Sequence, residues 1–428
     1  MKLIKHKLGD IANIEISGVD KKCIGQEIPV RLCNFVDVYR NWAITSEMAE
    51  GFMEATARQV EISKFTIKKG QVALTKDSET RDDIGISTYI ADDFDDVVLG
   101  YHNALITPNP ELLNGKYLNA LFHTEYAKKY FAFNASGSGQ RYSLSLEALN
   151  SFPVLLPPTL KEQEAIGNIF SHIDRKILLN RSINQNLEAM AKQLYDYWFV
   201  QFDFPDKNGR PYKSSGGKMV WNEKLKREIP ENWHSDNICL IAEILSGGTP
   251  SKRINEYWNC GHIPFFGPTD YNGSMFQLQT AYKITESGLQ HCSSSLFEED
   301  TIIITARGSI GKLVIVGTPM AMNQSCYALK SKNEEYEYLY FLTIQLIENL
   351  KAKGSGSVFK SIIASDIENT MLCVANKEII SLFCDKVRPI MKQIKKNTQE
   401  MIHLTKQRDD LLPLLMNGQV LVNSDLAY

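Results

Sequence analysis

The chain contains one internal repeat, and this repeat limits the folds open to it more than any other feature. Segment 72–75 recurs as 302–305 at an offset of 230 residues, and Gly137–Gly139 recurs as Gly354–Gly356 at an offset of 217. Each copy has the same order: a strand-like and aromatic-rich region, a Gly-Ser turn, and a long helical stretch. Self-similarity over such a period indicates a duplicated unit of one domain and one helix.

The two helical stretches carry apolar residues at alternating spacings of four and three. A 3.5-residue period sustained for more than four heptads is typical of a left-handed coiled coil, whereas an ordinary surface helix drifts toward 3.6. The alternative, that each helix is only an amphipathic helix of its own domain, stays open at this point. The seam positions are Ile166, Phe170, Ile173, Ile177, Asn180, Asn184, Leu187, Ala191, Leu194 and Trp198, and then Phe383, Val387, Ile390, Ile394, Asn397, Met401, Leu404, Arg408, Leu411 and Leu415.

Asn180, Asn184 and Asn397 occupy core heptad positions, where asparagine lowers stability but fixes the register of the helices. If a twofold axis relates the two copies, the helices run antiparallel. Aligning the centres of the two seams then places Asn184 near Asn397 and Asn180 near Met401. Pro389 predicts a kink or break in the first turns of the second helix.

The repeat predicts an α+β chain of two mixed α/β domains related by pseudo-twofold symmetry and joined by two long antiparallel coiled-coil helices. The connector is rich in Gly, Pro and Ser, which favours a loop. The expected segments are a first domain at 1–155, a first spacer helix at 156–200, a connector loop at 201–233, a second domain at 234–374, and a second spacer helix with a C-terminal tail at 375–428.

The charge balance argues against a self-sufficient nucleic-acid binder. The chain has 47 basic and 50 acidic residues, and the net charge is −3 over residues 1–150 and −4 over residues 234–372. Any DNA contact therefore needs basic groups gathered on one face, or a partner that supplies phosphate contacts. No apolar run approaches the roughly 20 residues of a membrane span, and the first residues do not resemble a secretory signal, so we expect a cytoplasmic protein without membrane contact.

No motif for catalysis stands out. There is no Asn/Asp-Pro-Pro-aromatic motif for adenine methylation, no H-E-x-x-H, and no G-x-S-x-G. Arg307–Lys312 lacks the spacing of a phosphate-binding loop, and the eight cysteines contain no C-x-x-C pair. The sequence therefore predicts a binding protein with no catalytic residue, no cofactor and no metal of its own.

Six stretches occur in an order that is specific to one protein family: Leu156–Ile166, Leu194–Phe199, Gly209–Met219, Ile229–Trp233, Gly247–Ser251 and Arg408–Gly418. On these stretches the chain resembles the specificity subunit of a Type I restriction-modification enzyme, over essentially its whole length. The first domain departs from the family in lacking a Gly-Gly-Thr-Pro turn, and the second helix lacks a Leu-Pro-Pro lead-in.

The resemblance implies two target-recognition domains, each reading one half-site of a bipartite double-stranded DNA target. It implies that the helices set the gap between half-sites and dock two copies of a methyltransferase (modification) subunit, with restriction subunits joining the assembly. S-adenosylmethionine, ATP and Mg are implied only for those partners. Two other hypotheses stay open: a non-catalytic coiled-coil scaffold for proteins without DNA binding, and a hydrolase without recognisable motifs.

Candidate DNA-reading residues follow from side-chain chemistry and not from matched family positions. Direct readout uses Arg, Lys, Asn or Gln on loops that enter the major groove. The alternative for each residue is a solvated surface group. The candidates are Lys76, Arg81, Asn103, Gln140 and Arg141 in the first domain, and Lys252, Arg253, Arg307, Asn323, Gln324 and Lys360 in the second.

Overall fold

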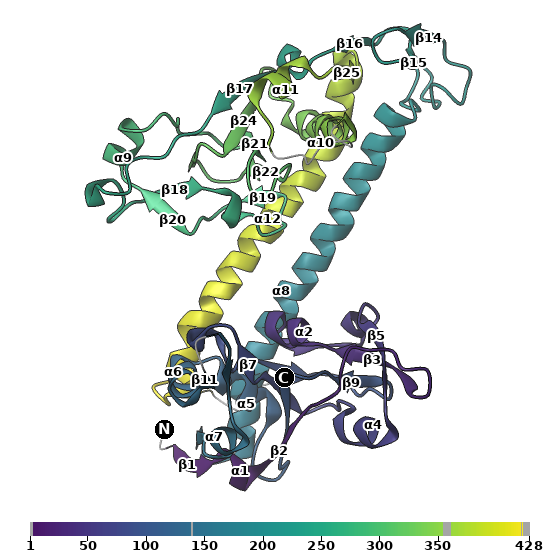
Figure 1. Ribbon diagram of the computed structural model, residues 1–428. Coiled ribbons are helices and arrows are strands. Elements are labelled where there is room, and N and C mark those ends of the chain that lie inside the picture. Colours follow the sequence, from purple (N-terminus) through teal and green to yellow (C-terminus); the bar gives the residue numbers. More distant parts are fainter. Residues whose placement is uncertain (1–2, 138–139, 354–360, 421, 423–428) are drawn as a thin grey trace. The chain divides into compact units, whose positions relative to one another are not determined.

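The structure is a computed structural model that describes residues 3–137, 140–353, 361–420 and 422 (Figure 1). The chain divides into two compact units. Unit 1 comprises residues 1–178 and 402–428, and unit 2 comprises residues 179–401. Two long helices, α8 (Leu160–Tyr195) and α12 (Lys377–Met416), each contribute one part to unit 1 and another to unit 2.

Unit 1 is built around a five-stranded sheet of order β2-β10-β6-β8-β4, whose neighbours are antiparallel except for the parallel pair β4 and β8. A three-stranded sheet, β5-β3-β9, and two small sheets, β1-β13 and β11-β12-β7, complete it. The strands are β1 (Ile4–Lys7), β2 (Ala12–Ile16), β3 (Ile28–Cys33), β4 (Ala43–Ile44), β5 (Met53–Ala57), β6 (Val72–Thr75), β7 (Asp77–Ser78), β8 (Ser87–Ile90), β9 (Val97–Leu99), β10 (Asn103–Pro108), β11 (Ser136–Gly137), β12 (Tyr142–Ser143) and β13 (Pro153–Leu156).

Short helices connect these strands, and several begin at side chains suited to capping. Asn114, Thr124 and Ser145 each accept hydrogen bonds from main-chain N–H groups of the first turn, which satisfies donors that a helix start leaves open. The helices are α1 (Leu8–Ile11), α2 (Phe35–Arg40), α3 (Ser46–Ala49), α4 (Gln59–Phe65), η1 (Arg81–Asp83), α5 (Gly115–Phe122), α6 (Glu125–Asn134) and α7 (Leu146–Asn150).

The last turns of α12 belong to the core of unit 1. Leu412 and Leu415 are buried in one cluster with Ile166 and Phe170 of α8. Arg408, the charged member of the seam, places its guanidinium 5.4 Å from the ring centre of Trp42. This cation–π contact explains how an arginine is accommodated at a seam position.

Unit 2 repeats the strand order of the two larger sheets of unit 1. Its five-stranded sheet has the order β17-β24-β21-β22-β19, again with one parallel pair at the edge, β19 and β22, and its three-stranded sheet is β20-β18-β23. β16 pairs with β25 as β1 pairs with β13. The strands are β16 (His234–Asp236), β17 (Ala242–Ser246), β18 (Ile263–Phe266), β19 (Phe276–Gln277), β20 (Tyr282–Ile284), β21 (Ile302–Thr305), β22 (Leu313–Val316), β23 (Ala321–Met322), β24 (Cys326–Ser331) and β25 (Leu372–Val374).

The duplication predicted from the sequence is therefore confirmed in the sheet topology of the two units. The helical elements of unit 2 are η3 (Ile238–Leu240), η4 (Asn255–Tyr257), η5 (Pro268–Asp270), α9 (Glu286–Gln290), α10 (Tyr336–Lys353) and α11 (Ala364–Asn369), and a π-helical turn, η2 (Asp196–Val200), follows α8.

The repeat extends to one detailed turn. The hydroxyl of Thr75, at the end of β6, accepts a hydrogen bond from the N–H of Ile86, and that of Thr305, at the end of β21, accepts one from Lys312. Gly85 and Gly311 precede these two donors with φ of +80° and +74°. Both turns therefore need a residue that tolerates left-handed backbone, which glycine does without steric cost.

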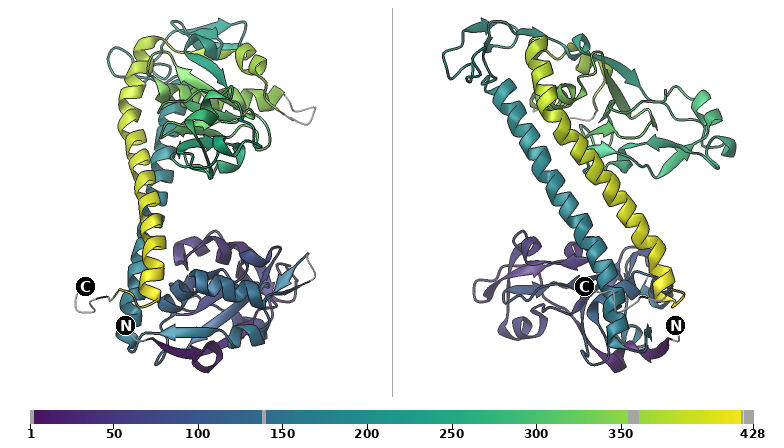
Figure 2. Two further views of the ribbon diagram at one scale, coloured as in Figure 1. Left: turned by 90° about the vertical axis from the view of Figure 1, so that its left-hand side faces the viewer. Right: turned by 180° about the vertical axis from the view of Figure 1, so that it is seen from behind.

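The heptad seam is confirmed as the buried face of the two helices, because each of its twenty positions is buried or half-buried. Within unit 2, α8 and α12 lie side by side (Figures 1 and 2). Asn397 Nδ2 donates to Asn184 Oδ1 over 2.8 Å, and Asn180 donates to Glu400. Since the residue numbers rise on one helix as they fall on the other, the helices are antiparallel. Asn180 was expected near Met401, and its hydrogen bond goes to Glu400, the residue before Met401.

Two expectations about local structure are wrong. Pro389 does not break the second helix, since α12 is continuous from Lys377 to Met416. The connector is not a plain loop, because it contains the hairpin of β14 (Met219–Asn222) and β15 (Arg227–Pro230). Its aromatic rings pack on one another: Phe204 stacks on both Tyr212 and Trp233, and this burial gives a Gly-rich segment a defined fold.

Among the described residues, no helix is long and apolar enough to cross a membrane. All eight cysteines are free thiols, and four of them are buried.

Candidate nucleic-acid interface

In unit 1, three loops that carry predicted DNA-reading residues meet at one end of the main sheet. The N–H of Lys76, which follows β6, donates to the carbonyl of His102 over 2.9 Å. The N–H of Leu144 donates to the carbonyl of Lys76 over 2.8 Å, and β12 pairs with β7. These main-chain bonds join the segment after β6, the turn before β10, and β12 with the residue that follows it.

The structure brings several candidates together on these loops. Arg81, Gln140 and Arg141 are exposed. The guanidinium of Arg81 lies 5.1 Å from the ring centre of Tyr142, a distance typical of a cation–π contact. Two arginines and a glutamine on adjacent loops supply donors of the kind that read guanine and adenine in the major groove.

Lys76 belongs to the same cluster, but its charge is already paired. Its Nζ lies 2.8 Å from both carboxylate oxygens of Asp77, and its side chain is 17% exposed. Burial alone would raise the pKa of Asp77, but hydrogen bonds from Lys76, Ser143 and His102 and the charge of Lys76 outweigh it and lower that pKa. Lys76 therefore holds a buried carboxylate instead of presenting a free cation to DNA, which revises its predicted role.

Asn103 is wrong as a DNA-reading residue. It is the first residue of β10, and its side chain is completely buried. Its Nδ2 donates to the carbonyl of Gly100 over 3.0 Å and lies 3.4 Å from that of Tyr101. A fully buried amide cannot reach a base, and Asn103 instead clamps the turn between β9 and β10.

That turn carries two residues that the sequence did not single out, Tyr101 and His102. Their rings are 3.9 Å apart, and His102 adopts a left-handed backbone with φ of +71°. His102 Nδ1 lies 2.5 Å from Asp77, and its Nε2 lies 3.3 Å from Nη2 of Arg141. Positive φ at a residue other than glycine is uncommon and draws attention to His102. This backbone conformation cannot be read from the sequence, so the residue could not be singled out there.

In unit 2, the corresponding loops also meet at one end of the sheet. Three main-chain N–H groups donate to main-chain carbonyls there. The pairs are Gly248 to Met322, Ala306 to Ser325, and Asn323 to Phe266. Four candidates on these loops are exposed, namely Lys252, Arg253, Arg307 and Gln324. The hydroxyl of Thr249 donates to Gln324, which ties the Gly-Gly-Thr-Pro turn to the loop before β24.

Asn323 is half-buried, and its Oδ1 accepts hydrogen bonds from the N–H of Ser325 and the thiol of Cys326. This geometry shapes the turn between β23 and β24. Lys360 and the turn Gly354–Gly356 lie outside the described residues, so the structure gives no position for them.

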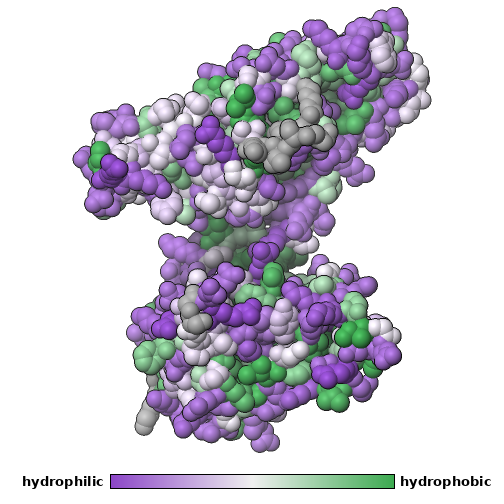
Figure 3. All heavy atoms as spheres, in the orientation of Figure 1, coloured by the Kyte–Doolittle hydropathy of each residue, from purple (hydrophilic) through white to green (hydrophobic). Residues whose placement is uncertain are grey.

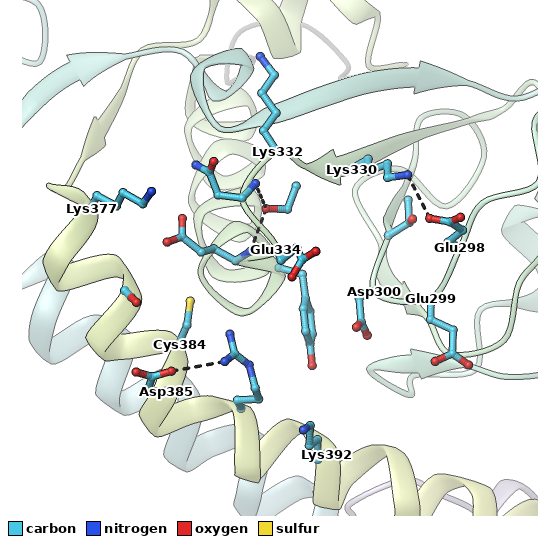
Figure 4. A pocket seen from close by; sticks show the side chains of 17 residues that line it. Glu298, Glu299, Asp300, Lys330, Lys332, Glu334, Lys377, Cys384, Asp385 and Lys392 are labelled. Atoms are coloured by element: carbon cyan, nitrogen blue, oxygen red, sulfur yellow. Dashed lines mark hydrogen bonds and ion pairs between the residues drawn. The ribbon is translucent and has the colours of Figure 1, made fainter.

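One cavity in unit 2 does not suit a polyanion. It has a volume of about 910 Å³ and lies where α12 meets α10 and the sheet (Figure 4). Its lining includes six carboxylates and five cations, and ion pairs such as Lys330–Glu298 and Arg388–Asp385 join them. A phosphate would meet at least as many negative as positive groups, so the loops and not this cavity form the candidate interface.

Hydrophilic side chains predominate on the face of unit 2 in Figure 3.

Comparison with known proteins identifies a family and two similar relatives. The family described as "Type I restriction modification DNA specificity domain" matches residues 5–189 and 230–404, one match for each copy of the repeat. A specificity subunit of the Type I restriction enzyme HindI from Haemophilus influenzae is 25% identical over 410 residues, covering 84% of this chain and 88% of the relative. That of MjaIX from Methanocaldococcus jannaschii is 27% identical over 323 residues, covering 72% and 69%.

A solved structure shares the fold. The crystal structure of a Type I restriction-modification S subunit from M. genitalium superimposes with a TM-score of 0.58 and covers 97% of this chain and 96% of that one. At 15% sequence identity, this likeness bears on the fold alone.

Proposed function

Because the chain belongs to the family of Type I restriction-modification DNA specificity domains, with two matched copies, we propose that it reads a bipartite double-stranded DNA target, one half-site per domain. The observation that supports this most is that the two units share one sheet topology but carry different side chains on their loops. Duplicated scaffolds present their loops in equivalent ways, as a twofold dimer does on a split DNA site. Unlike loops then read unlike half-sites.

The loop chemistry differs between the two units at matched positions. Lys76 and Asp77 follow the end of β6, whereas Ala306 and Arg307 follow the end of β21. Unit 1 thus places a paired Lys–Asp at this corner, and unit 2 places an exposed arginine there. We propose that Arg81, Gln140 and Arg141 read the first half-site, and that Lys252, Arg253, Arg307 and Gln324 read the second.

The same proposal assigns chemistry to partner subunits. Two modification subunits methylate the DNA with S-adenosylmethionine, and restriction subunits add ATP- and Mg-dependent cleavage, while this chain selects the site in the cytoplasm. Since neither domain carries a positive excess, the partners supply much of the phosphate neutralisation. The isolated chain should therefore bind DNA weakly, and its complex with the modification subunit should bind the cognate site orders of magnitude more tightly.

An exposed apolar stripe lies on α8. Leu179, Ile183 and Met190 are exposed apolar residues on this helix, and Tyr197 continues the series in the turn that follows. Ile183, Met190 and Tyr197 are seven residues apart, so they share one helix face, next to the seam positions Asn184, Ala191 and Trp198. An exposed apolar stripe is typical of a protein interaction site. We propose that a modification subunit packs on it.

The experiment that tests DNA reading is a domain exchange in the assembled complex. Residues 1–155 are replaced by the first domain of another family member, and the methylated sites are mapped by sequencing. The expected result is a new first half-site beside an unchanged second half-site. A change in both halves would contradict independent reading, and a complex that binds no DNA in sequence-specific fashion would favour the protein scaffold instead.

The docking surface is tested separately by co-purification. Met190→Glu should lower recovery of the modification subunit at least tenfold, because burying an unpaired carboxylate in an apolar contact is costly. Val60→Glu, on another exposed apolar residue, 75% exposed on α4, serves as the control and should leave recovery unchanged. Normal recovery with Met190→Glu would contradict the assigned surface.

A further inference from the structure

In the candidate interface of unit 1, one histidine has contacts on both ring nitrogens. His102 Nδ1 lies 2.5 Å from Asp77 Oδ2, and its Nε2 lies 3.3 Å from Arg141 Nη2. A carboxylate can only accept a hydrogen bond, and a guanidinium can only donate one. Both contacts therefore require the same neutral tautomer, with the proton on Nδ1 and the lone pair on Nε2.

The carboxylate that selects this tautomer is held in place. Asp77 is 7% exposed, and it accepts hydrogen bonds from Lys76 as well as from His102. The position of His102 is set by the buried amide of Asn103 one residue later, and by the ring of Tyr101. The imidazole is thus held from both sides, with its free lone pair directed at an exposed arginine.

Arg141 by itself has little to orient it. It directly precedes β12 and is exposed. A long, exposed side chain samples many rotamers, and ordering it on binding costs free energy. A fixed acceptor for one of its N–H groups reduces that cost and leaves its other donors for a ligand.

We propose that His102 is a positioning residue that orients Arg141 for a base of the first half-site. This inference rests on the proposed DNA reading by unit 1. It gives Lys76 and Asp77 an indirect role in specificity, since they fix the tautomer. The described part of unit 2 has no counterpart of this histidine, because the residue at the matched main-chain hydrogen bond there is Ser325. The device thus belongs to the first half-site alone.

The test measures DNA binding by the full chain assembled with its modification subunits. A set of DNA sites carries each single base-pair change in either half-site. Arg141→Ala should reduce discrimination between the cognate and the altered base pair at one position of the first half-site. The expected reduction is about 5- to 150-fold, the usual range for a two-pronged arginine contact. His102→Asn keeps a residue that tolerates left-handed backbone but cannot bridge Asp77 and Arg141. It should weaken discrimination at that same base pair.

A double variant separates positioning from a structural role. If His102 acts through Arg141, then His102→Asn in the Arg141→Ala background causes no further loss at that base pair. Uniform weakening across the first half-site would overturn the proposal, as would full discrimination in His102→Asn or no effect of Arg141→Ala. His262→Asn, at another imidazole–carboxylate pair with Glu286 in unit 2, is the control and should leave the first half-site unchanged. If the complex without any substitution showed no sequence-specific DNA binding, that result would instead refute the proposed function.

Discussion

Asn397 donates a hydrogen bond to Asn184 over 2.8 Å inside the buried seam between α12 and α8. Neither amide is left unpaired: Asn184 Nδ2 donates to the carbonyl of Ile394 and lies 3.2 Å from the hydroxyl of Thr398, and Gln393 donates to Asn397. A satisfied polar pair in an apolar seam is costly to move, since sliding by one heptad would place both amides against apolar side chains. We infer that this pair fixes the register.

The first prediction concerns this pair. Asn184→Leu leaves the amide of Asn397 without its acceptor, and should lower the free energy of unfolding by about 1–3 kcal/mol. The double variant Asn184→Leu/Asn397→Leu should lose less than the sum of the single losses, because no buried amide remains unpaired. Urea unfolding measures each value. Asn180→Leu is the control with a smaller loss, since its partner Glu400 is half-buried and can be hydrated. Strict additivity would contradict the coupling.

A second prediction concerns the ion pair of Glu337 and Arg388 in unit 2. Glu337 is completely buried, and its Oε1 accepts from Arg388 Nε over 2.7 Å. Arg388→Met should cost about 3–5 kcal/mol of unfolding free energy, because it leaves a buried charge without its partner. Adding Glu337→Leu should recover most of that loss. Lys395→Met breaks the pair with the half-exposed Glu299 and should cost less than 1 kcal/mol. Equal losses would show that burial of Glu337 is unimportant.

A third prediction follows from Glu188 on α8, where burial raises the pKa of the carboxyl group to about 7. Between pH 4.5 and 7 the folded state keeps a proton that the unfolded state releases, so this group lowers stability as the pH rises. Glu188→Gln should therefore stabilise the protein at pH 8 and have no such effect below pH 4.5. The midpoint of urea unfolding at several pH values provides the measurement. A pH-independent difference would mean that the carboxyl titrates normally.

The fourth prediction compares two glycines with left-handed backbone. Gly85 has φ of +80°, and a Cβ there would lie 2.3 Å from the ring of the buried Phe131. Gly209 has φ of +75° with nothing within 4 Å of such a Cβ. Gly209→Ala should cost about 1–2 kcal/mol from backbone strain, and Gly85→Ala about 1–3 kcal/mol more from overpacking. Thermal unfolding of both variants tests this, and similar losses would show that Phe131 moves aside.

The fifth prediction concerns the length of the helices. Four residues inserted after 178 in α8 and four after 401 in α12 keep the Asn184–Asn397 pair intact. At 1.5 Å per residue, the insertion lengthens each helix by about 6 Å, close to two base pairs of DNA. We expect the methylated target to gain about two base pairs between unchanged half-sites. An unchanged spacer in the sequencing map would refute a measuring role for the helices.

The sequence predicted the features that depend on periodicity. Heptad spacing identified the seam, and alignment of the two seam centres about a twofold axis placed Asn184 near Asn397, because a helix converts position along the chain directly into position in space. The expected duplication also appears as matched strand orders. Pro389 misled, since a proline in a helix removes one hydrogen bond, and packing of neighbouring seam residues such as Val387 and Ile394 offsets that loss.

The candidate site was less predictable. Asp77, His102 and Arg141 come together only because β12 pairs with β7 and the N–H of Lys76 bonds to the carbonyl of His102. No spacing along the chain indicates that these residues meet. Asn103 had suitable chemistry but lies inside the sheet. Composition gave a wrong prediction for the connector. Its glycines and prolines indicate a loop, but its aromatic rings pack on one another and give it a defined fold.

Unit 1 is assembled from the beginning and the end of the chain, with Leu412, Leu415 and Met416 in its core. On the ribosome, its first 178 residues emerge early, but the α12 residues of their core are synthesised last. At about 5–20 residues per second, synthesis of the intervening 179–401 takes roughly 10 to 45 s. Unit 2 is continuous and can complete its core first. A nascent chain that stops near residue 401 would keep unit 2 and expose the apolar face of unit 1, which marks it for quality control.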